Sequence, residues 1–429
     1  MRLGGRLGAA IEVLDDIETR HRPAADAMRD WGLSHRFAGS GDRAAVGNLV
    51  YDALRRRHAA AWLLDDDSPR ALILGSFLLE NGLNVAALEE ALAGDPFAPA
   101  QLSEREREAL AGRKDSPMPD TVRANVPEWC LPLLKQVFGE AWVEECAALC
   151  DRPPLDLRAN TLKGTRDRVV KALARHGAEP TRIAPQGVRI PPIEGYGRHP
   201  SLQGTEAFQR GWFEVQDEGS QIVAELAGAE PGMQVLDYCA GAGGKTLACS
   251  ARMQNRGQIF AFDADPQRLM PIHERIRRAG CRNVQIVFSQ ERLVGMEGQF
   301  DLVLVDAPCT GSGTWRRRPD AKWRLSAQRL ETRVADQSAI LDAVSPLVKP
   351  GGVIAYITCS IFEEENGRQV EAFLRRNPAF ELADHDALWR ARFPHASVPV
   401  RISANGITLT PATTDTDGFF FAMLGRRGH

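Results

Sequence analysis

The stretch Val235-Leu-Asp-Tyr-Cys-Ala-Gly-Ala-Gly-Gly-Lys-Thr246 joins an apolar run, a loop with three glycines and the start of a helical segment. Apolar runs and helical segments keep alternating after it. We expect strands at 234–238, 258–263, 284–288, 301–306 and 353–358, and helices at 244–251, 266–279 and 331–347. Several of the runs are apolar throughout, which is typical of parallel strands buried on both faces. The pattern predicts an α/β fold with a Rossmann-like, doubly wound sheet that binds ligands at the carboxyl ends of its strands.

The regions around this sheet have different patterns. Residues 1–150 carry apolar residues at helical spacing, with start signals at Ser68-Pro69 and at the capping box Ser103-x-x-Glu106, and they predict an all-helical domain. Residues 151–215 predict a small α/β module, and residues 216–429 form the sheet domain. The segments 406–410 and 417–424 resemble a hairpin that closes the sheet.

The glycine loop predicts a cofactor site. Glycines let the backbone turn and approach a ligand closely, and Asp263, at the end of the next expected strand, can bind ribose hydroxyls. These features alone fit either a dinucleotide or S-adenosyl-L-methionine (SAM). The loop matches neither GxGxxG nor GxxxxGK[ST], and the missing phosphate-binding pattern favours SAM. The expected cofactor residues here are Cys239, Ala240, Gly241, Ala242, Gly243, Gly244, Lys245 and Asp263.

Two cysteines follow two neighbouring strands of the expected sheet. Cys309 stands in Asp306-Ala-Pro-Cys309 and Cys359 in Thr358-Cys-Ser360, so both should lie at the carboxyl edge beside the glycine loop. A thiolate that adds to carbon 6 of a cytosine makes carbon 5 nucleophilic enough to accept a methyl group. Asp306 can assist by hydrogen bonding at the edge of the ring as charge builds there. A positive neighbour such as Lys245 or the SAM sulfonium should lower the pKa of the attacking thiol.

In these motifs the chain resembles the RsmB/Nop/Sun family of RNA (cytosine-5) methyltransferases. The resemblance extends from Leu157-Arg-Ala-Asn-Thr-Leu-Lys163 to Asp417-Gly-Phe-Phe420 and includes Asp306-Ala-Pro-Cys-Thr-Gly-Ser-Gly-Thr314 and Thr358-Cys-Ser-Ile-Phe-Glu-Glu-Glu-Asn366. It implies a SAM-methyltransferase fold preceded by a small RNA-binding module. Residues 43–62 are similar, more weakly, to the NusB-like helical domain of the ribosomal-RNA members.

The resemblance also implies roles for single residues. Cys359 corresponds to the nucleophile, Cys309 to the cysteine that assists release of the product, and Asp306 to the acid after the fourth strand. The loop from Cys239 to Lys245 and Asp263 correspond to SAM-binding residues. Gln290 stands where the family has an aspartate that contacts adenine.

Two alternatives remain open on the sequence. A DNA cytosine-5 methyltransferase would use Cys309 as its nucleophile, although the Thr-Cys-Ser motif speaks against it. A non-catalytic ribosome-assembly factor would keep the SAM fold only as a scaffold, and Gln290 gives that reading some support.

Composition limits the partners. The 429-residue chain has a net charge of −3, which argues against a non-specific nucleic-acid coat protein. We expect a cytoplasmic monomer without a metal or a membrane segment. RNA is the expected partner, ribosomal RNA before transfer RNA. The expected RNA contacts are the basic cluster of residues 152–182 and the segment Trp315–Trp323, with Arg317 and Arg318 gripping RNA at the rim of the pocket.

Overall fold

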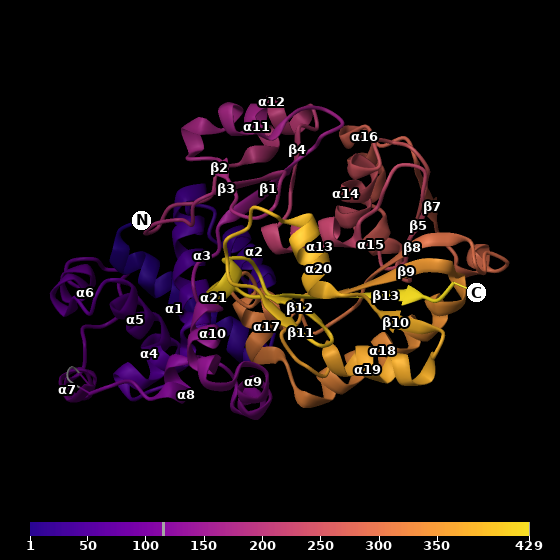
Figure 1. Cartoon of the computed structure of the whole chain (residues 1–429). Helices are drawn as coiled ribbons and strands as arrows, with labels where there is room; N and C mark the ends of the chain where they lie inside the picture. Colours follow the sequence, from indigo (N-terminus) through magenta and orange to yellow (C-terminus); the bar gives the residue numbers. More distant parts are fainter. Residues whose placement is uncertain (114–115, 429) are drawn as a thin grey trace. The chain divides into compact units, whose positions relative to one another are not determined.

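The computed structural model describes residues 1–113 and 116–428, which form two compact units, coloured by sequence in Figure 1. Unit 1 contains Met1–Pro153, Pro192–His199 and Thr314–Ser326. Unit 2 contains Pro154–Pro191, Pro200–Gly313 and Ala327–His429. Within the described ranges no helix is both long and apolar enough to cross a membrane. The division into three domains expected from the sequence stays a prediction.

Unit 1 is helical, as the apolar spacing predicts. Ser68 caps α5 by accepting a hydrogen bond from the Ala71 N–H, and Ser103 and Glu106 exchange the two hydrogen bonds of a capping box at the start of α7. The helices of this unit are α1 (Leu3–Arg20), α2 (Ala24–Ser34), α3 (Ser40–Arg55), α4 (Arg57–Leu64), α5 (Pro69–Glu80), α6 (Val85–Leu92), α7 (Glu104–Arg113), α8 (Asp120–Arg123), α9 (Leu131–Phe138), α10 (Trp142–Ala148) and α17 (Pro319–Arg324).

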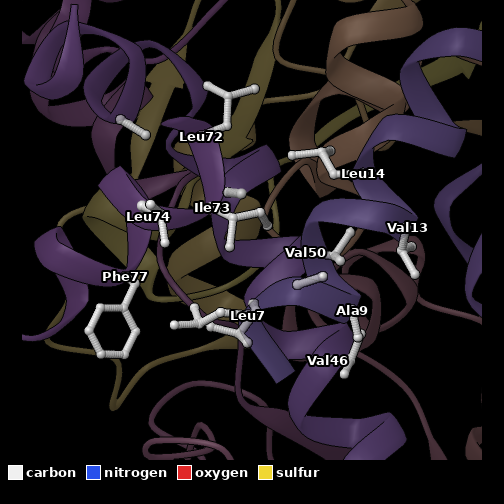
Figure 2. Close-up of a cluster of buried hydrophobic side chains, with 14 of the residues drawn as sticks. Leu7, Ala9, Val13, Leu14, Val46, Val50, Leu72, Ile73, Leu74 and Phe77 are labelled. Carbon is white, nitrogen blue, oxygen red and sulfur yellow. The ribbon is translucent and has the colours of Figure 1, made fainter. Parts of the chain in front are cut away.

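The core of unit 1 lies between α1, α3 and α5. Leu7 and Leu14 from α1, Val46 from α3, and Leu72 and Phe77 from α5 are buried in one cluster. Figure 2 shows these side chains converging from the three helices. Residues spaced by about a helical turn thus supply the buried apolar area that holds the unit together.

A distant segment completes unit 1. In Thr314–Ser326 the ammonium of Lys322 donates to the backbone oxygen of Arg55 at 3.0 Å, and the indole N–H of Trp323 donates to that of Leu54 at 2.6 Å. Lys322 is buried, and burial lowers its pKa. This segment follows the Cys309 motif in the sequence, yet it packs on the N-terminal helices.

Unit 2 begins with a four-stranded antiparallel sheet in the order β2-β3-β1-β4. Val169 and Leu173 pack on this sheet against Leu157, Val188 and Phe213. The helical part of this module is α11, which is followed by a 3-10 turn at Ala174–His176. The elements are β1 (Leu155–Ala159), α11 (Arg166–Ala172), β2 (Glu179–Pro180), β3 (Gly187–Ile190), α12 (Glu206–Gln209) and β4 (Phe213–Val215).

The large sheet has the order β11-β12-β13-β9-β8-β5-β6-β7, with β10 paired to β13. Strands β5 to β9 are parallel to one another, whereas β13 runs antiparallel to β9 and to β12. This confirms the Rossmann-like, doubly wound SAM-methyltransferase fold. The strands are β5 (Gln234–Asp237), β6 (Gln258–Phe262), β7 (Val284–Val287), β8 (Phe300–Asp306), β9 (Val348–Thr358), β10 (Phe380–Leu382), β11 (Arg401–Ser403), β12 (Gly406–Leu409) and β13 (Phe419–Arg426).

Successive residues of these strands enter opposite cores. Val235 and Leu304 pack on one face with Ile222 of α13, whereas Leu236 and Val303 pack on the other. Figure 1 shows helices on both sides of the sheet, with α18 and α19 on one and α13 and α20 on the other. The helices are α13 (Glu218–Ala227), α14 (Gly244–Arg252), α15 (Pro266–Leu269), α16 (Ile272–Ala279), α18 (Ala327–Val344), α19 (Gly367–Arg376), α20 (His385–Arg392) and α21 (Pro411–Thr414).

The expectation of one helix at 266–279 was wrong. The chain forms α15 and α16, separated at Met270-Pro271. Proline lacks the N–H that would continue the hydrogen bonding of α15, which explains the break.

Candidate active site

The site lies where the winding of the large sheet reverses direction. β5 and β8 are neighbours, but the chain proceeds from β5 to β6 and β7 on one side, and from β8 to β9 on the other. Ligands of doubly wound sheets bind beyond the carboxyl ends of strands at such a switch point. The glycine loop follows β5, Asp263 follows β6, and the two cysteines follow β8 and β9.

The glycine loop is built for close approach. Gly241 and Gly243 have φ of +51° and +84°, a conformation that other residues rarely adopt. A Cβ at Gly243 would lie 2.4 Å from Cγ1 of Ile272, so the loop packs directly on α16. Gly243 also caps α14 without a side-chain bond, which leaves N–H groups of the first helical turn available to a ligand.

Asp263 is bound to this loop. Its Oδ2 accepts a hydrogen bond from the Gly241 N–H at 2.9 Å, and its Oδ1 accepts one from the Asp265 N–H at 2.9 Å. The side chain is buried, with Nη1 of Arg268 at 3.8 Å. The acid therefore sits beside the turn, as required of a ribose-binding carboxylate.

Asp237, at the end of β5, is a site residue that the sequence analysis missed. Its Oδ2 accepts a hydrogen bond from the Thr246 hydroxyl at 2.6 Å, while its buried Oδ1 has no hydrogen-bond partner among the described residues. Burial raises the pKa of Asp237 to about 7. A buried carboxylate oxygen without a donor suits a ligand that carries a cationic nitrogen, as the methionine part of SAM does. With the glycine turn and Asp263, the residues present fit SAM.

Lys245 and Asp306 form an ion pair. The ammonium of Lys245 donates to Oδ2 of Asp306 at 2.7 Å and lies 5.4 Å from the ring centre of Phe419. The lysine side chain is 7% exposed and the aspartate 35%, so the pair presents a carboxylate rather than an ammonium to solvent. Lys245, the positive neighbour expected to lower the pKa of the attacking thiol, is thus paired with Asp306.

The sulfur atoms of Cys309 and Cys359 are 3.3 Å apart. The sequence placed both cysteines at neighbouring strand ends, and the structure brings them into contact. The hydrogen bond with Cys359 and burial are the main causes that raise the pKa of Cys309 well above its usual range. Cys309 is therefore the member of the pair that is held as a thiol.

Three further cysteines are held as thiols by burial. Burial raises the pKa of Cys130 and of Cys249 to about 12, and it raises the pKa of Cys239 well above its usual range. Cys239 nevertheless belongs to the loop, with Ala240 and Ala242 beside the two turning glycines and Gly244 opening α14. Thiols held protonated in this way are poor nucleophiles.

Gln290 stands apart from the buried part of the site. It is the exposed first residue of a 3-10 turn after β7, Gln290–Leu293. A contact of its amide with adenine stays a prediction.

The expectation for the Trp315–Trp323 segment was wrong in part. Trp315, Arg316 and Lys322 are buried, which removes them from the surface that RNA can reach. Arg318 is exposed and Arg317 half-buried, so these two remain accessible to RNA, and their place at the rim of the pocket stays a prediction. The cause is the packing of this segment in unit 1.

The basic cluster of residues 152–182 also contains both buried or paired side chains and exposed ones. Arg152 pairs with Asp52 in unit 1, and Arg158 is buried in unit 2, where its Nη1 donates to the backbone oxygen of Gly244 at 2.9 Å. The guanidinium of Arg168 stacks over the ring of Trp212 at 3.7 Å. The basic side chains of this cluster that are exposed are Lys163, Arg168, Lys171, Arg175 and Arg182.

Family models match two parts of the chain. Residues 225–425 match a model described as 16S rRNA methyltransferase RsmB/F, and residues 126–192 match the ferredoxin-like domain of RsmF/B-like methyltransferases. The first covers the large sheet and the second includes β1, β2 and β3.

Individual proteins are also similar. A probable ribosomal RNA small subunit methyltransferase B from Synechocystis is 34% identical over 308 residues, which cover 70% of this chain and 66% of that protein. A methyltransferase homologue from Pyrococcus horikoshii aligns with a TM-score of 0.58 and 27% identity, covering 72% of this chain and 97% of that one. The crystal structure of PH0851 aligns over 98% of both chains with a TM-score of 0.72 and 23% identity, which shows a shared fold.

Proposed function

The chain belongs to the RsmB/F family of SAM-dependent methyltransferases, and from that premise we propose that it methylates carbon 5 of a cytosine in ribosomal RNA through a transient bond to Cys359. The alignment spans 66% of the length of the Synechocystis relative. Substrate, reaction position and nucleophile are therefore proposals about this chain.

One observation carries the proposal: two thiols, on neighbouring strand ends, have their sulfur atoms 3.3 Å apart beside the ion pair of Lys245 and Asp306. Carbon-5 methylation needs a nucleophile for ring carbon 6 and a group that helps to end the adduct. A pair of thiols in which one is held protonated supplies both.

The cofactor would be held by the loop from Cys239 to Lys245, with Asp263 at the ribose and Asp237 at the ammonium group. SAM, when bound, supplies an electrophilic methyl carbon attached to a sulfonium sulfur. The positive φ of Gly241 and Gly243 and the open first turn of α14 support this assignment.

The residues then divide the chemistry. The Cys359 thiolate forms a bond to carbon 6 and moves an electron pair toward carbon 5, the atom that gains the methyl group. Asp306 accepts a hydrogen bond from the cytosine amino group and so positions the ring, while the ammonium of Lys245 paired with it offsets the negative charge that builds on the ring. Solvent water then takes the carbon-5 proton, and the electron pair left behind re-forms the double bond between carbons 5 and 6 as the bond between sulfur and carbon 6 breaks. The Cys309 thiol assists release by donating a hydrogen bond to the departing Cys359 sulfur, 3.3 Å away.

The RNA must present an unpaired or flipped cytosine, because carbon 6 is shielded within a stacked helix. The exposed basic side chains near α11 suit the phosphates of such a strand. The Arg168–Trp212 stack adds a flat surface of the kind on which unpaired bases stack.

Covalent trapping tests the proposal. RNA that contains 5-fluorocytosine lacks the proton that must leave, so the adduct persists and is seen as a shifted band on a denaturing gel. We expect adduct with the wild type and with Cys309→Ala, and none with Cys359→Ala. Trapping by Cys359→Ala but not by Cys309→Ala would favour a DNA-type use of Cys309. A wild type that binds SAM poorly and traps nothing would favour the scaffold alternative.

Bisulfite sequencing of cellular RNA tests the substrate. We expect one or more cytosines of ribosomal RNA to lose protection when the gene is deleted. Loss of protection confined to transfer RNA would move the assignment to that substrate and leave the cysteine chemistry untouched.

A further inference from the structure

A buried carboxylate connects the two cysteine loops. The side chain of Glu365 is fully buried, and each of its oxygens accepts two hydrogen bonds. Oε1 accepts from the Thr310 N–H at 2.8 Å and from the Gln337 amide at 3.0 Å. Oε2 accepts from the Thr310 hydroxyl at 2.5 Å and from the Ser360 hydroxyl. Burial raises the pKa of Glu365, whereas four donors aimed at its oxygens favour the ionised carboxylate, which is the form that accepts at every site.

The donors are the immediate neighbours of the two cysteines. Thr310 follows Cys309, and Ser360 follows Cys359. Gln337 also donates to the backbone oxygen of Pro308, the residue before Cys309, at 3.0 Å. One side chain from beyond β9 thus holds both loops at the residues next to the two cysteines.

A second set of contacts shows that the two loops form one structure. The Gly313 N–H donates to the backbone oxygen of Cys359 at 3.0 Å, and the Ser312 hydroxyl lies 3.0 Å from that of Ser360. The hydroxyl of Ser312 also accepts from the Ile361 N–H at 2.9 Å. Glu365 is the charged member of this network, and a buried hydrogen-bonded network rigidifies what it holds.

We propose that Glu365 is a positioning residue of the two-cysteine reaction: its carboxylate holds the Cys309 and Cys359 loops in register and assigns the two thiols their different roles. The inference rests on the proposed function. Its negative charge is the reason for the second part. Both carboxylate oxygens accept from Thr310 and only Oε2 accepts from Ser360, so the anion bears more strongly on the Cys309 loop, where it disfavours a thiolate. This charge is one of the causes that raise the pKa of Cys309.

The variant Glu365→Gln removes the negative charge of this side chain and can keep its hydrogen bonds. Its amide oxygen can take the place of Oε1, which faces two N–H donors, and its NH₂ can take the place of Oε2, which faces two hydroxyls able to rotate and accept. The four hydrogen bonds can thus persist without the charge. Glu364→Gln is the matched control, because that neighbouring carboxylate pairs with Arg368 at 3.0 Å.

The readout is the alkylation rate of each cysteine by iodoacetamide at pH 8, measured by peptide mass spectrometry. In the wild type Cys359 should react faster than Cys309. In Glu365→Gln the ratio of the two rates should fall at least fivefold, and in Glu364→Gln it should not change. An unchanged ratio in a folded Glu365→Gln would overturn the assignment of roles. This assay uses no RNA, so its result is independent of whether the proposed reaction occurs.

Thr310→Val tests the positioning part and guards against a Glu365 variant that does not fold. It keeps the branched shape at position 310, deletes one hydroxyl donor and leaves the charge of Glu365 in place. We expect trapping of 5-fluorocytosine RNA to slow at least fivefold, with the affinity for SAM unchanged. Trapping at the wild-type rate would overturn the proposal, whereas a wild type that traps nothing would instead remove the proposed function.

Discussion

At the scale of the residue, the acid at the end of β5 has the most unusual ionisation in the site. Asp237 combines a pKa raised to about 7 with a buried oxygen that accepts no hydrogen bond from residues 1–113 or 116–428. The unfolded pKa of an aspartate is about 3.9, so the folded protein binds this proton more strongly, and the contribution of Asp237 to stability falls as the pH rises from about 4 to 7. Ionisation at neutral pH therefore costs stability, which a cationic ligand can offset.

This predicts pH-dependent binding of SAM. Between pH 6 and 7.5 the carboxylate becomes ionised while the ligand stays cationic, so the affinity measured by calorimetry should rise about five- to tenfold. Asp237→Asn should bind at least tenfold more weakly at pH 7.5 and lose the pH dependence. Asp342→Asn, on α18, serves as the control. An equally steep pH dependence in Asp237→Asn would assign the titration to another group.

Site residues that directly follow strands could be predicted from the sequence, whereas site residues whose role depends on burial could not. Cys309, Cys359, Asp306 and Lys245 stand in local motifs whose strands could be recognised. Glu365 matters largely because of Gln337 and Thr310, which come from 28 and 55 residues away, and no local pattern encodes those two partners. The exposure of Gln290 and the burial of Trp315 likewise depend on packing alone.

At the scale of the element, the turn between β5 and α14 depends on a single backbone geometry. Gly243→Ala would strain the positive φ and place a methyl group 2.4 Å from Ile272. The strain and the overpacking together should lower the free energy of unfolding by about 2–5 kcal/mol. Thermal unfolding would show this as a lower Tm. Gly244→Ala is the control for stability, because its nearest contact would be 3.7 Å and its φ is not positive. Equal Tm values for the two variants would contradict this account.

The order of strands and helices could be predicted from the periodicity of the sequence, but the first or last residue of several elements could not. Each expected strand of the parallel sheet was found, and differences at their ends are mostly one residue. β9 begins five residues before the expected 353, because Val348 pairs with Phe300 across a register shift. Pro350 and Gly351 in this stretch hid the strand, since both residues are rare inside strands.

At the scale of the whole molecule, unit 1 is assembled from three separate stretches of chain around Asp52. Its buried carboxylate accepts from Nη1 of Arg55 at 2.7 Å and from Nη2 of Arg152 at 2.5 Å. Arg55 in turn donates to the backbone oxygen of Arg316, and Arg152 to those of Ile193 and Gly195. One acid thereby connects α3 to residues of both distant segments.

Asp52→Ala should consequently destabilise unit 1 by about 3–5 kcal/mol, because it leaves two arginines without their buried partner. Urea unfolding followed by tryptophan fluorescence can measure this, since six of the eight tryptophans belong to unit 1. Asp65→Ala, which removes an exposed partner of Arg113, should cost less than about 1 kcal/mol. Similar losses for both variants would mean that Asp52 contributes no more than a surface charge.

RNA binding tests the exposed part of the 314–326 segment. Replacing Arg317 and Arg318 with alanine should weaken RNA binding severalfold and reduce its salt dependence by up to one counterion per lost phosphate contact. SAM affinity should stay the same, and Arg375→Ala on α19 is the control. Filter binding at several salt concentrations would measure the effect, and unchanged RNA affinity would remove these arginines from the interface.

The discontinuous make-up of unit 1 has a consequence for inheritance. A gene that lost its first 150 codons would still encode Trp323 and Lys322. The protein would lack Leu54 and Arg55, whose backbone oxygens accept hydrogen bonds from these two side chains. The chain after Cys309 would then continue into α17 without the N-terminal helices on which α17 packs. The helical part is therefore no detachable module that evolution or an engineer can swap freely, and the two halves of the gene must change in step.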